Sequence, residues 1–378
     1  MLNNKPVLGM MLAAGLATVA VDAMAQFQME INPRGRFHLD FAVHDEDERE
    51  LGDKFRVRRA RLGLSGKVAE DWRFQVEYDF AENSTQARDV YLRYTGFSYG
   101  DITIGHFKVP FGLEELISSN NISNIERSLP VTTFAQSRRV GVGWSNSGEQ
   151  WGASVMGFGQ GSGSAVRSDD SADEGLGIGG RFYYNPVIDS NTVIHLGIAG
   201  TWEEPENSQL DQVRLRTRPE SRPTGARLID TGNIGNVSSI AQLGLEAAWR
   251  SGPWSLQGEW MRSDISRKSG SPDVDFSGWY VSGSWVLTGE SRGYRDGVFR
   301  GVSPSGAGGA WEVTARLSYV DLDDGPIFGG DQRNVTVGLN WYANSRVRFM
   351  SNLIFVDSER QGVDDDPLIF LMRAQVSF

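Results

Sequence analysis

The residues best able to do chemistry in this chain are arginines that recur at every second position. Arg59 and Arg61 alternate with Ala60 and Leu62 in the stretch FRVRRARLGLSGKV, residues 55–68. Successive side chains of a β-strand point to opposite faces, so one face of this stretch carries guanidinium groups and the other is apolar. A guanidinium stays charged and binds an oxyanion through two parallel hydrogen bonds. The stretch therefore indicates a cationic, hydrated surface suited to holding anions.

Other alternating segments also place charged side chains on the face opposite their apolar residues. The arginines on such faces are Arg36, Arg59, Arg61, Arg73, Arg93, Arg139, Arg181 and Arg316. Carboxylates share these faces, among them Asp40, Glu77, Asp79, Asp89, Glu246, Glu259 and Glu312. If these faces line a watery interior, anion selectivity requires the arginines to be concentrated where that interior is narrow.

A second group of arginines lies in the run VRLRTRPESRP. Arg214, Arg216 and Arg218 alternate along it, and Arg222 and Arg227 follow. Three cations on one face of an extended segment repel each other unless an anion or a carboxylate lies between them. Several weak sites in a row would let an anion enter and leave, so the run is interpreted as an anion ladder. A solvated basic loop is the alternative.

Catalytic and metal-binding patterns are not readable in the sequence. The chain has no cysteine, and its four histidines, His38, His44, His106 and His195, show no ligand spacing. No Ser/His/Asp grouping, phosphate-cradling loop or nucleic-acid-binding motif is recognisable. The sequence therefore predicts a protein that is not an enzyme, with no catalytic residues, no cofactor, no metal site and no nucleic-acid partner.

The elements that would position the arginines are short alternating segments, about sixteen of them between residues 34 and 378. Each is near the 9–11 residues that cross a bilayer as a tilted strand. Many of the tryptophans and tyrosines fall near segment ends, as at a lipid–water boundary. Lipid cannot satisfy open strand edges, so the sheet must close. The sequence predicts an all-β fold, a transmembrane antiparallel β-barrel of about 16 strands.

The connections between these segments alternate between long and short. We call the long set the outer connections; they are residues 44–54, 81–88, 110–138, 159–175, 203–237, 263–275, 321–332 and 357–367. The third and the fifth are far longer than a hairpin needs, and we expect both to fold into the barrel. Residues 289–309 are the exception: they form a long connection at the end of the barrel where the other connections are short turns. Acidic residues in the outer connections serve solubility or hold cations that bridge lipopolysaccharide phosphates.

The two ends of the chain carry targeting signals. Lys5, an apolar run over residues 7–21 and the small residues Ala23 and Ala25 predict a secretory signal peptide over residues 1–25. Residues 26–378 then form one barrel domain. The last segment, residues 368–378, has an apolar face that ends in a terminal phenylalanine, which resembles the assembly signal of outer-membrane barrel proteins.

Four stretches carry a resemblance to a known family. They are FRVRRARLGLSGKVAEDWRFQVEYDF at residues 55–80, RDVYLRY at 88–94, ITIGHFKVPFGLEELISSNNISNIERSLP at 102–130 and GAWEVTARLSY at 309–319. The chain resembles the phosphate-selective porins of the porin O and porin P type. This resemblance implies a homotrimer of sixteen-stranded barrels in the bacterial outer membrane. It also implies inward-folded third and fifth outer loops, an inward-folded periplasmic turn at residues 289–309, and a passive channel for phosphate or polyphosphate.

The resemblance further implies an arginine ladder through the eyelet, the narrowest part of such a channel. The residues that look like ladder members are Arg36, Arg59, Arg61, Arg127, Arg214, Arg216 and Arg218, with Arg222 next along the run; Lys108 and Asp89 look like further eyelet residues. One departure is that only Lys54, Lys67, Lys108 and Lys268 follow the signal segment. With acidic outer connections, the field drawing anions in is weak. A weakly selective porin for other small anionic solutes is therefore the alternative.

Overall fold

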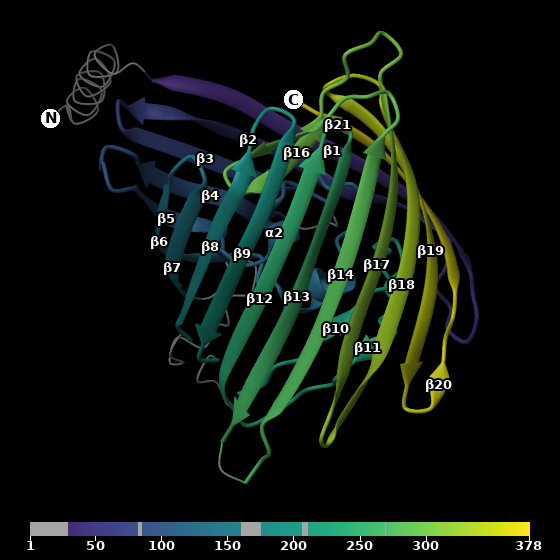
Figure 1. Cartoon of the computed structure of the whole chain (residues 1–378). Helices are drawn as coiled ribbons and strands as arrows, with labels where there is room; N and C mark the ends of the chain where they lie inside the picture. Colours follow the sequence, from purple (N-terminus) through teal and green to yellow (C-terminus); the bar gives the residue numbers. More distant parts are fainter. Residues whose placement is uncertain (1–28, 82–84, 160–174, 206–210, 269) are drawn as a thin grey trace, which may run out of the picture.

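The protein is a closed β-barrel whose interior holds several folded segments (Figure 1). The computed structural model describes residues 29–81, 85–159, 175–205, 211–268 and 270–378. The expected signal peptide, residues 1–25, lies outside the described residues. No described helix is long and apolar enough to cross a membrane.

Sixteen long strands form the wall, each antiparallel to its neighbours in the sequence. They are β1 (Glu30–Asp45), β2 (Lys54–Ala69), β3 (Trp72–Asp79), β4 (Gln86–Tyr94), β5 (Asp101–Lys108), β6 (Arg138–Ser147), β7 (Trp151–Phe158), β8 (Gly177–Ile188), β9 (Thr192–Glu203), β12 (Val237–Ser251), β13 (Trp254–Arg267), β14 (Val274–Val286), β17 (Ala310–Asp324), β18 (Ile327–Tyr342), β19 (Val347–Arg360) and β21 (Leu368–Ser377). Strand β21 pairs with β1 and closes the sheet. The predicted antiparallel barrel of about 16 strands is confirmed.

The pairing of the first and last strands, which closes the barrel, extends to the C-terminal residue Phe378. Backbone hydrogen bonds join Gly35 and Phe378 in both directions, with N···O distances of 3.0 and 3.1 Å. A Cβ atom on Gly35 would come within 2.4 Å of the Phe378 ring. The phenyl ring of Phe378 therefore has room only because the residue opposite it on β1, Gly35, has no side chain.

The barrel is apolar outside and polar inside, the reverse of a soluble protein. Leu62 on β2 is 57% exposed, whereas His38 on β1 is fully buried behind the wall. Aromatic pairs lie beside the short connections, for example Trp254 stacked on Trp285 with ring centroids 4.6 Å apart. Such rings suit the lipid–water boundary, and the apolar band between them suits lipid.

Some outer connections are shorter than the alternation predicts. A loop was expected at residues 321–332, but β17 and β18 continue pairing there as far as Asp324 and Ile327. A tight turn at residues 325–326 joins them, with Gly325 at a positive φ of 52°. The prediction was wrong because polar residues were assigned to loops, whereas this hairpin continues beyond the apolar band. Strand β19 is likewise longer, and it pairs with β20 (Val363–Asp364).

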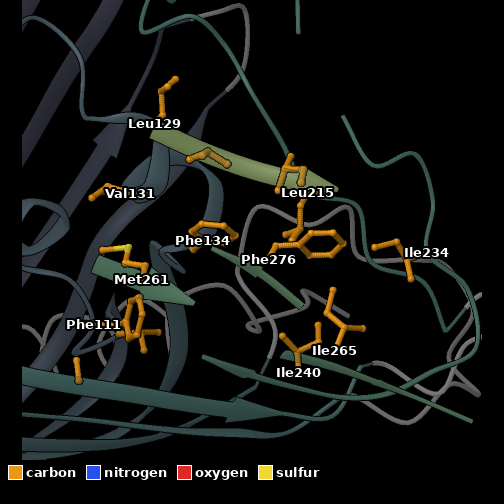
Figure 2. Close-up of a cluster of buried hydrophobic side chains, with 14 of the residues drawn as sticks. Phe111, Leu129, Val131, Phe134, Leu215, Ile234, Ile240, Met261, Ile265 and Phe276 are labelled. Carbon is orange, nitrogen blue, oxygen red and sulfur yellow. The ribbon is translucent and has the colours of Figure 1, made fainter. Parts of the chain in front are cut away.

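Three segments fold into the barrel. The third outer connection carries α2 (Leu113–Leu116) and α3 (Leu129–Phe134), the fifth carries the hairpin of β10 (Arg216–Thr217) and β11 (Ile229–Asp230), and the turn between β14 and β17 carries β15 (Arg292–Arg295) and β16 (Val298–Val302). Their apolar side chains form cores inside the wall. In one core Phe134 and Leu215 pack with Phe276 of β14 (Figure 2). In another, Ile117 packs with Phe299.

Candidate functional site

One large cavity of about 990 Å³ lies inside the barrel, against strands β1 to β8. Several inward positions of β6 and β7 carry small residues: Gly143, Ser145, Gly152 and Ser154 all line the cavity. Helix α3 packs instead against β13, β14 and β17, and β11 packs against β18 and β19. The free space therefore lies where the inward side chains leave room for it.

The cavity wall is strongly cationic. Its fourteen basic residues are Arg34, Arg36, Arg58, Arg59, Arg61, Arg88, Arg93, Lys108, Arg127, Arg138, Arg181, Arg222, Arg295 and Arg300. Its four carboxylates are Asp89, Asp101, Glu115 and Asp296. An excess of one sign inside a low-dielectric wall raises the local concentration of the opposite ion. The cavity lining can therefore attract anions.

The cavity gathers most, but not all, of the residues that the sequence singled out. Arg36, Arg59, Arg61, Asp89, Lys108, Arg127 and Arg222 line it. The other three do not. Arg214 pairs with Asp230 across the small β10–β11 hairpin, with two N···O distances of 2.6 Å. Arg216 is exposed, and Nε of Arg218 donates to the carbonyl of Thr224 at 3.1 Å.

Ion pairs hold most of the cavity cations in place. Arg36 and Arg61 both contact Glu77, at 3.0 and 3.4 Å, and Nε of Arg61 lies 2.8 Å from Asp79. Arg138 binds Asp89 through two nitrogens, at 2.9 and 3.2 Å. These carboxylates fix the guanidinium groups and partly neutralise them. The paired arginines Arg36, Arg61 and Arg138 nevertheless line the cavity.

Lys108 and Arg127 form a similar group on the third outer connection. Nζ of Lys108 lies 3.8 Å from Glu115, and Nε of Arg127 lies 3.1 Å from the same carboxylate. Burial raises the pKa of the Glu115 carboxyl, but the charges of Arg127 and Lys108 outweigh it, so this pKa lies below its ordinary value. Glu115 is therefore ionised at neutral pH, and it holds both cations at the cavity.

Arg59 differs from these cations. It is 2% exposed, and no carboxylate oxygen of the described residues lies within 4.0 Å of its guanidinium group. Its Nη1 donates instead to Nδ1 of His38 at 3.2 Å, and Nε2 of His38 lies 3.1 Å from Oδ1 of Asn120. This network assigns His38 as the neutral tautomer protonated at Nε2. Nε of Arg59 has no hydrogen-bond partner within the described residues. Arg59 is thus a buried cation held by a neutral group.

Six arginines that line the cavity were not singled out from the sequence: Arg34, Arg58, Arg88, Arg138, Arg295 and Arg300. Two of them, Arg58 and Arg88, have a structural reason. Each lies at a β-bulge. Arg59 pairs with His38 and Val57 with Leu39, so Arg58 has no opposite residue. On β4, Arg88 and Asp89 together oppose the single residue Glu77, because Val90 pairs with Val76 and Ala87 with Tyr78. A bulge turns an extra side chain to the same face. The only sequence signal was the pair of adjacent charged residues at each position.

Comparison with known proteins identifies the family of this chain. A family profile described as "Phosphate-selective porin O and P" matches residues 31–378. The chain belongs to this family. Porin O of Pseudomonas aeruginosa is 26% identical over 405 residues, covering 96% of this chain and 91% of that protein. The porin is therefore an outer-membrane channel protein of bacteria and not an enzyme, as the sequence predicted.

Solved structures agree on the fold. An anion-selective porin from Comamonas acidovorans has a TM-score of 0.58 at 13% identity, covering 93% of this chain and all of that one. A loop L8 deletion mutant of OmpT from Vibrio cholerae has a TM-score of 0.60 at 9% identity, covering 93% of this chain and 99% of that one. At these identities the likeness concerns the β-barrel alone.

Buried carboxylates of the porin wall bind the inner segments to it. Glu259 on β13 accepts the backbone N–H groups of Leu113 and Glu114, at 2.5 and 2.9 Å. Arg373 on β21 binds Asp40 through two nitrogens at 2.6 and 2.7 Å, and Glu126 at 2.7 Å. Since β13 and β21 are five strands apart in the ring, the third outer connection is attached to the wall at separate places and occupies part of the interior.

The small residues of the wall lead to a prediction about conductance. Ser154 faces the cavity on β7, and a Ser154→Trp change would fill space next to Arg181 on the neighbouring strand. We expect the single-channel conductance to fall by about half or more, because the path becomes narrower. Planar-bilayer recording measures this. Val142→Trp, on the lipid face of β6, is the matched control and should leave conductance unchanged. Equal conductance for Ser154→Trp and the parent would place the ion path elsewhere.

Proposed function

We propose that this porin is a passive, anion-selective channel and that inorganic phosphate or polyphosphate is its preferred solute. The observation that carries this proposal is the excess of basic residues around the cavity, fourteen against four carboxylates. Guanidinium groups replace water around a phosphate with paired, charge-assisted hydrogen bonds. Several such groups along one path favour both binding and release.

The comparisons support the proposal through what they say of other proteins. The matching family is described as phosphate-selective. One structural neighbour is described as an anion-selective porin. The arginine-lined cavity adds a physical basis for the same property in this chain.

Within this proposal the sequence-predicted residues take two roles. Arg36, Arg59, Arg61, Lys108, Arg127 and Arg222, together with Asp89, would form the eyelet. Arg214, Arg216 and Arg218 would act before it, on the β10–β11 hairpin. Burial, together with the positive charge of the nearby Arg216 and Arg222, lowers the Arg227 pKa to about 10. This proximity would make the hairpin a basic approach to the cavity.

A weakly selective porin for other small anionic solutes is the second candidate. It is favoured by the ion pairs of the cavity, because carboxylates such as Glu77 and Asp79 already neutralise part of the positive charge. It is also favoured by the acidic residues of the first outer connection, Asp45 to Asp53, in a chain with a net charge of −11. Such a wall would select for charge rather than for phosphate.

Planar-bilayer recording separates the candidates. In a gradient of potassium chloride, the proposal expects a reversal potential on the anion side. Submillimolar phosphate should then reduce the chloride current. A reversal potential on the cation side would refute the anion channel, whereas anion selectivity without block by phosphate would favour the second candidate.

We further propose that the porin is a homotrimer surrounded by outer-membrane lipid. The apolar outer face of the barrel supports contact with lipid and with other copies. An OmpT structure of Vibrio cholerae, described as a trimer form, has a TM-score of 0.54 to this chain at 9% identity. The mass of the detergent-solubilised, unheated porin tests this assembly; a monomer mass would contradict it.

A further inference from the structure

Two aromatic rings form a corner in the cavity wall that the arginine pathway does not explain. Tyr91 on β4 and Phe107 on β5 both line the cavity, with ring centroids 6.2 Å apart and ring planes at 73°. Gly143 on β6 lies beside Phe107, and a Cβ atom there would come within 3.0 Å of the ring. The Phe107 ring therefore fits at this corner because its neighbour Gly143 has no side chain.

Two guanidinium groups flank this corner. The Arg93 guanidinium lies over the Tyr91 ring at 5.3 Å, and its Nε donates to Oγ1 of Thr103 at 3.0 Å. Arg34 donates to Oε1 of Gln75 at 2.7 Å, and the Tyr91 hydroxyl donates to the same oxygen at 3.3 Å. These contacts connect six residues into one cluster: Arg34, Gln75, Tyr91, Arg93, Thr103 and Phe107. All six line the cavity.

These two cations are only weakly neutralised. The closest carboxylate contacts are 4.0 Å for Arg34, to Glu77, and 4.0 Å for Arg93, to Asp101. Arg138, by comparison, binds Asp89 at 2.9 Å. Neutral partners, an amide and a hydroxyl, thus orient Arg34 and Arg93 without cancelling their charge. The cluster combines flat apolar surface with positive charge on one side.

The aromatic surface does not help to bind inorganic phosphate, because a hydrated anion makes no favourable contact with the face of an aromatic ring. A flat organic ring does gain from it, since aromatic rings attract one another in edge-to-face and offset arrangements. The whole cavity, of about 990 Å³, has room for such a solute, since sites of small organic molecules usually measure about 300–1,000 Å³.

We propose that Arg34, Gln75, Tyr91, Arg93, Thr103 and Phe107 form a second solute site, which takes organic anions that carry a planar ring, such as aryl phosphates and aryl carboxylates. The ring packs in the corner of Tyr91 and Phe107, and the anionic group accepts hydrogen bonds from Arg93 and Arg34. The inference rests on the proposed anion channel, but it is independent of the preference for inorganic phosphate.

The test compares anions of equal charge with and without a ring. Chloride current through the porin is recorded in planar bilayers with phenyl phosphate, methyl phosphate or inorganic phosphate added, and benzoate is compared with acetate in the same way. We expect phenyl phosphate to block at a concentration about tenfold lower than methyl phosphate. In Phe107→Leu, which keeps an apolar side chain, the ratio should fall below about twofold. Block by inorganic phosphate should not change.

Tyr91 supplies the matched pair of variants. Tyr91→Phe keeps the ring and should keep the preference for phenyl phosphate, whereas Tyr91→Leu should lose it. Equal block by phenyl and methyl phosphate in the unmodified porin would overturn the inference and leave the phosphate channel standing. An unchanged ratio in both leucine variants would overturn it as well. A cation-side reversal potential, by contrast, would refute the channel proposal and the inference together.

Discussion

Replacing Arg59 with glutamine should raise the phosphate concentration needed to block the chloride current by about 10- to 100-fold, because a hydrogen bond to a charged group contributes about 1.5–3 kcal/mol. Arg59 is the buried cation that His38 holds without a carboxylate, and its Nε has no partner among the described residues. The Arg59 side chain lines the cavity, so its charge would act on an anion held there. Current–voltage recording with increasing phosphate measures the effect.

Two variants make this test specific. Arg59→Lys restores the charge but not the planar fork, so it should restore anion selectivity more fully than block by phosphate. The double variant Arg216→Ala with Arg218→Ala removes charges that do not line the cavity, and we expect it to have a smaller effect than Arg59→Gln. Unchanged block in Arg59→Gln would contradict the assignment of Arg59 to the phosphate site.

The barrel could be predicted from the sequence because the pattern that specifies it, apolar and polar residues in alternation, can be recognised within each strand separately. Each strand alternates apolar and polar residues, and a closed ring is the only way to satisfy the edges in lipid. The same rule placed Arg36, Arg59 and Arg61 on the inner face. It failed at Arg58 and Arg88 because a bulge adds one residue to one strand and changes the face of the next side chain. Pairing partners, not propensity, determine where a bulge occurs.

The neutralisation of the arginines could not be predicted for a different reason. Arg373 binds Asp40, which lies 333 residues away in the sequence, and the two meet only because the last strand pairs with the first. Arg214 forms an ion pair with Asp230 of β11, the strand that pairs with β10 over two residues. Counting arginines therefore overstates the free positive charge of the interior. The useful distinction is between cations paired with carboxylates and those, such as Arg59, held by neutral groups.

Glu220 provides the second large expected effect, since it joins three parts of the interior. Its carboxylate accepts hydrogen bonds from Arg316 of β17 at 2.5 Å, from Ser318 at 2.6 Å, from Thr336 of β18 at 3.0 Å and from the N–H of Leu129 at 3.1 Å. It lies on the fifth outer connection, two residues before Arg222, and has a positive φ of 54°. One side chain thus binds both inner loops to the wall.

Glu220→Ala should therefore loosen both loops, because breaking a buried ion pair costs about 3–5 kcal/mol. We expect single-channel conductance to rise about twofold or more, and anion selectivity to fall, as the constriction loses its attachment. Glu220→Gln is the matched control: its amide oxygen still accepts from Leu129 and Ser318, so its effect should be smaller. Circular dichroism and heat-modifiable migration show whether the barrel itself is intact. A folded Glu220→Ala barrel with unchanged conductance and reversal potential would mean that the loops are held in place without this carboxylate, by contacts such as those of Glu259 and Arg373.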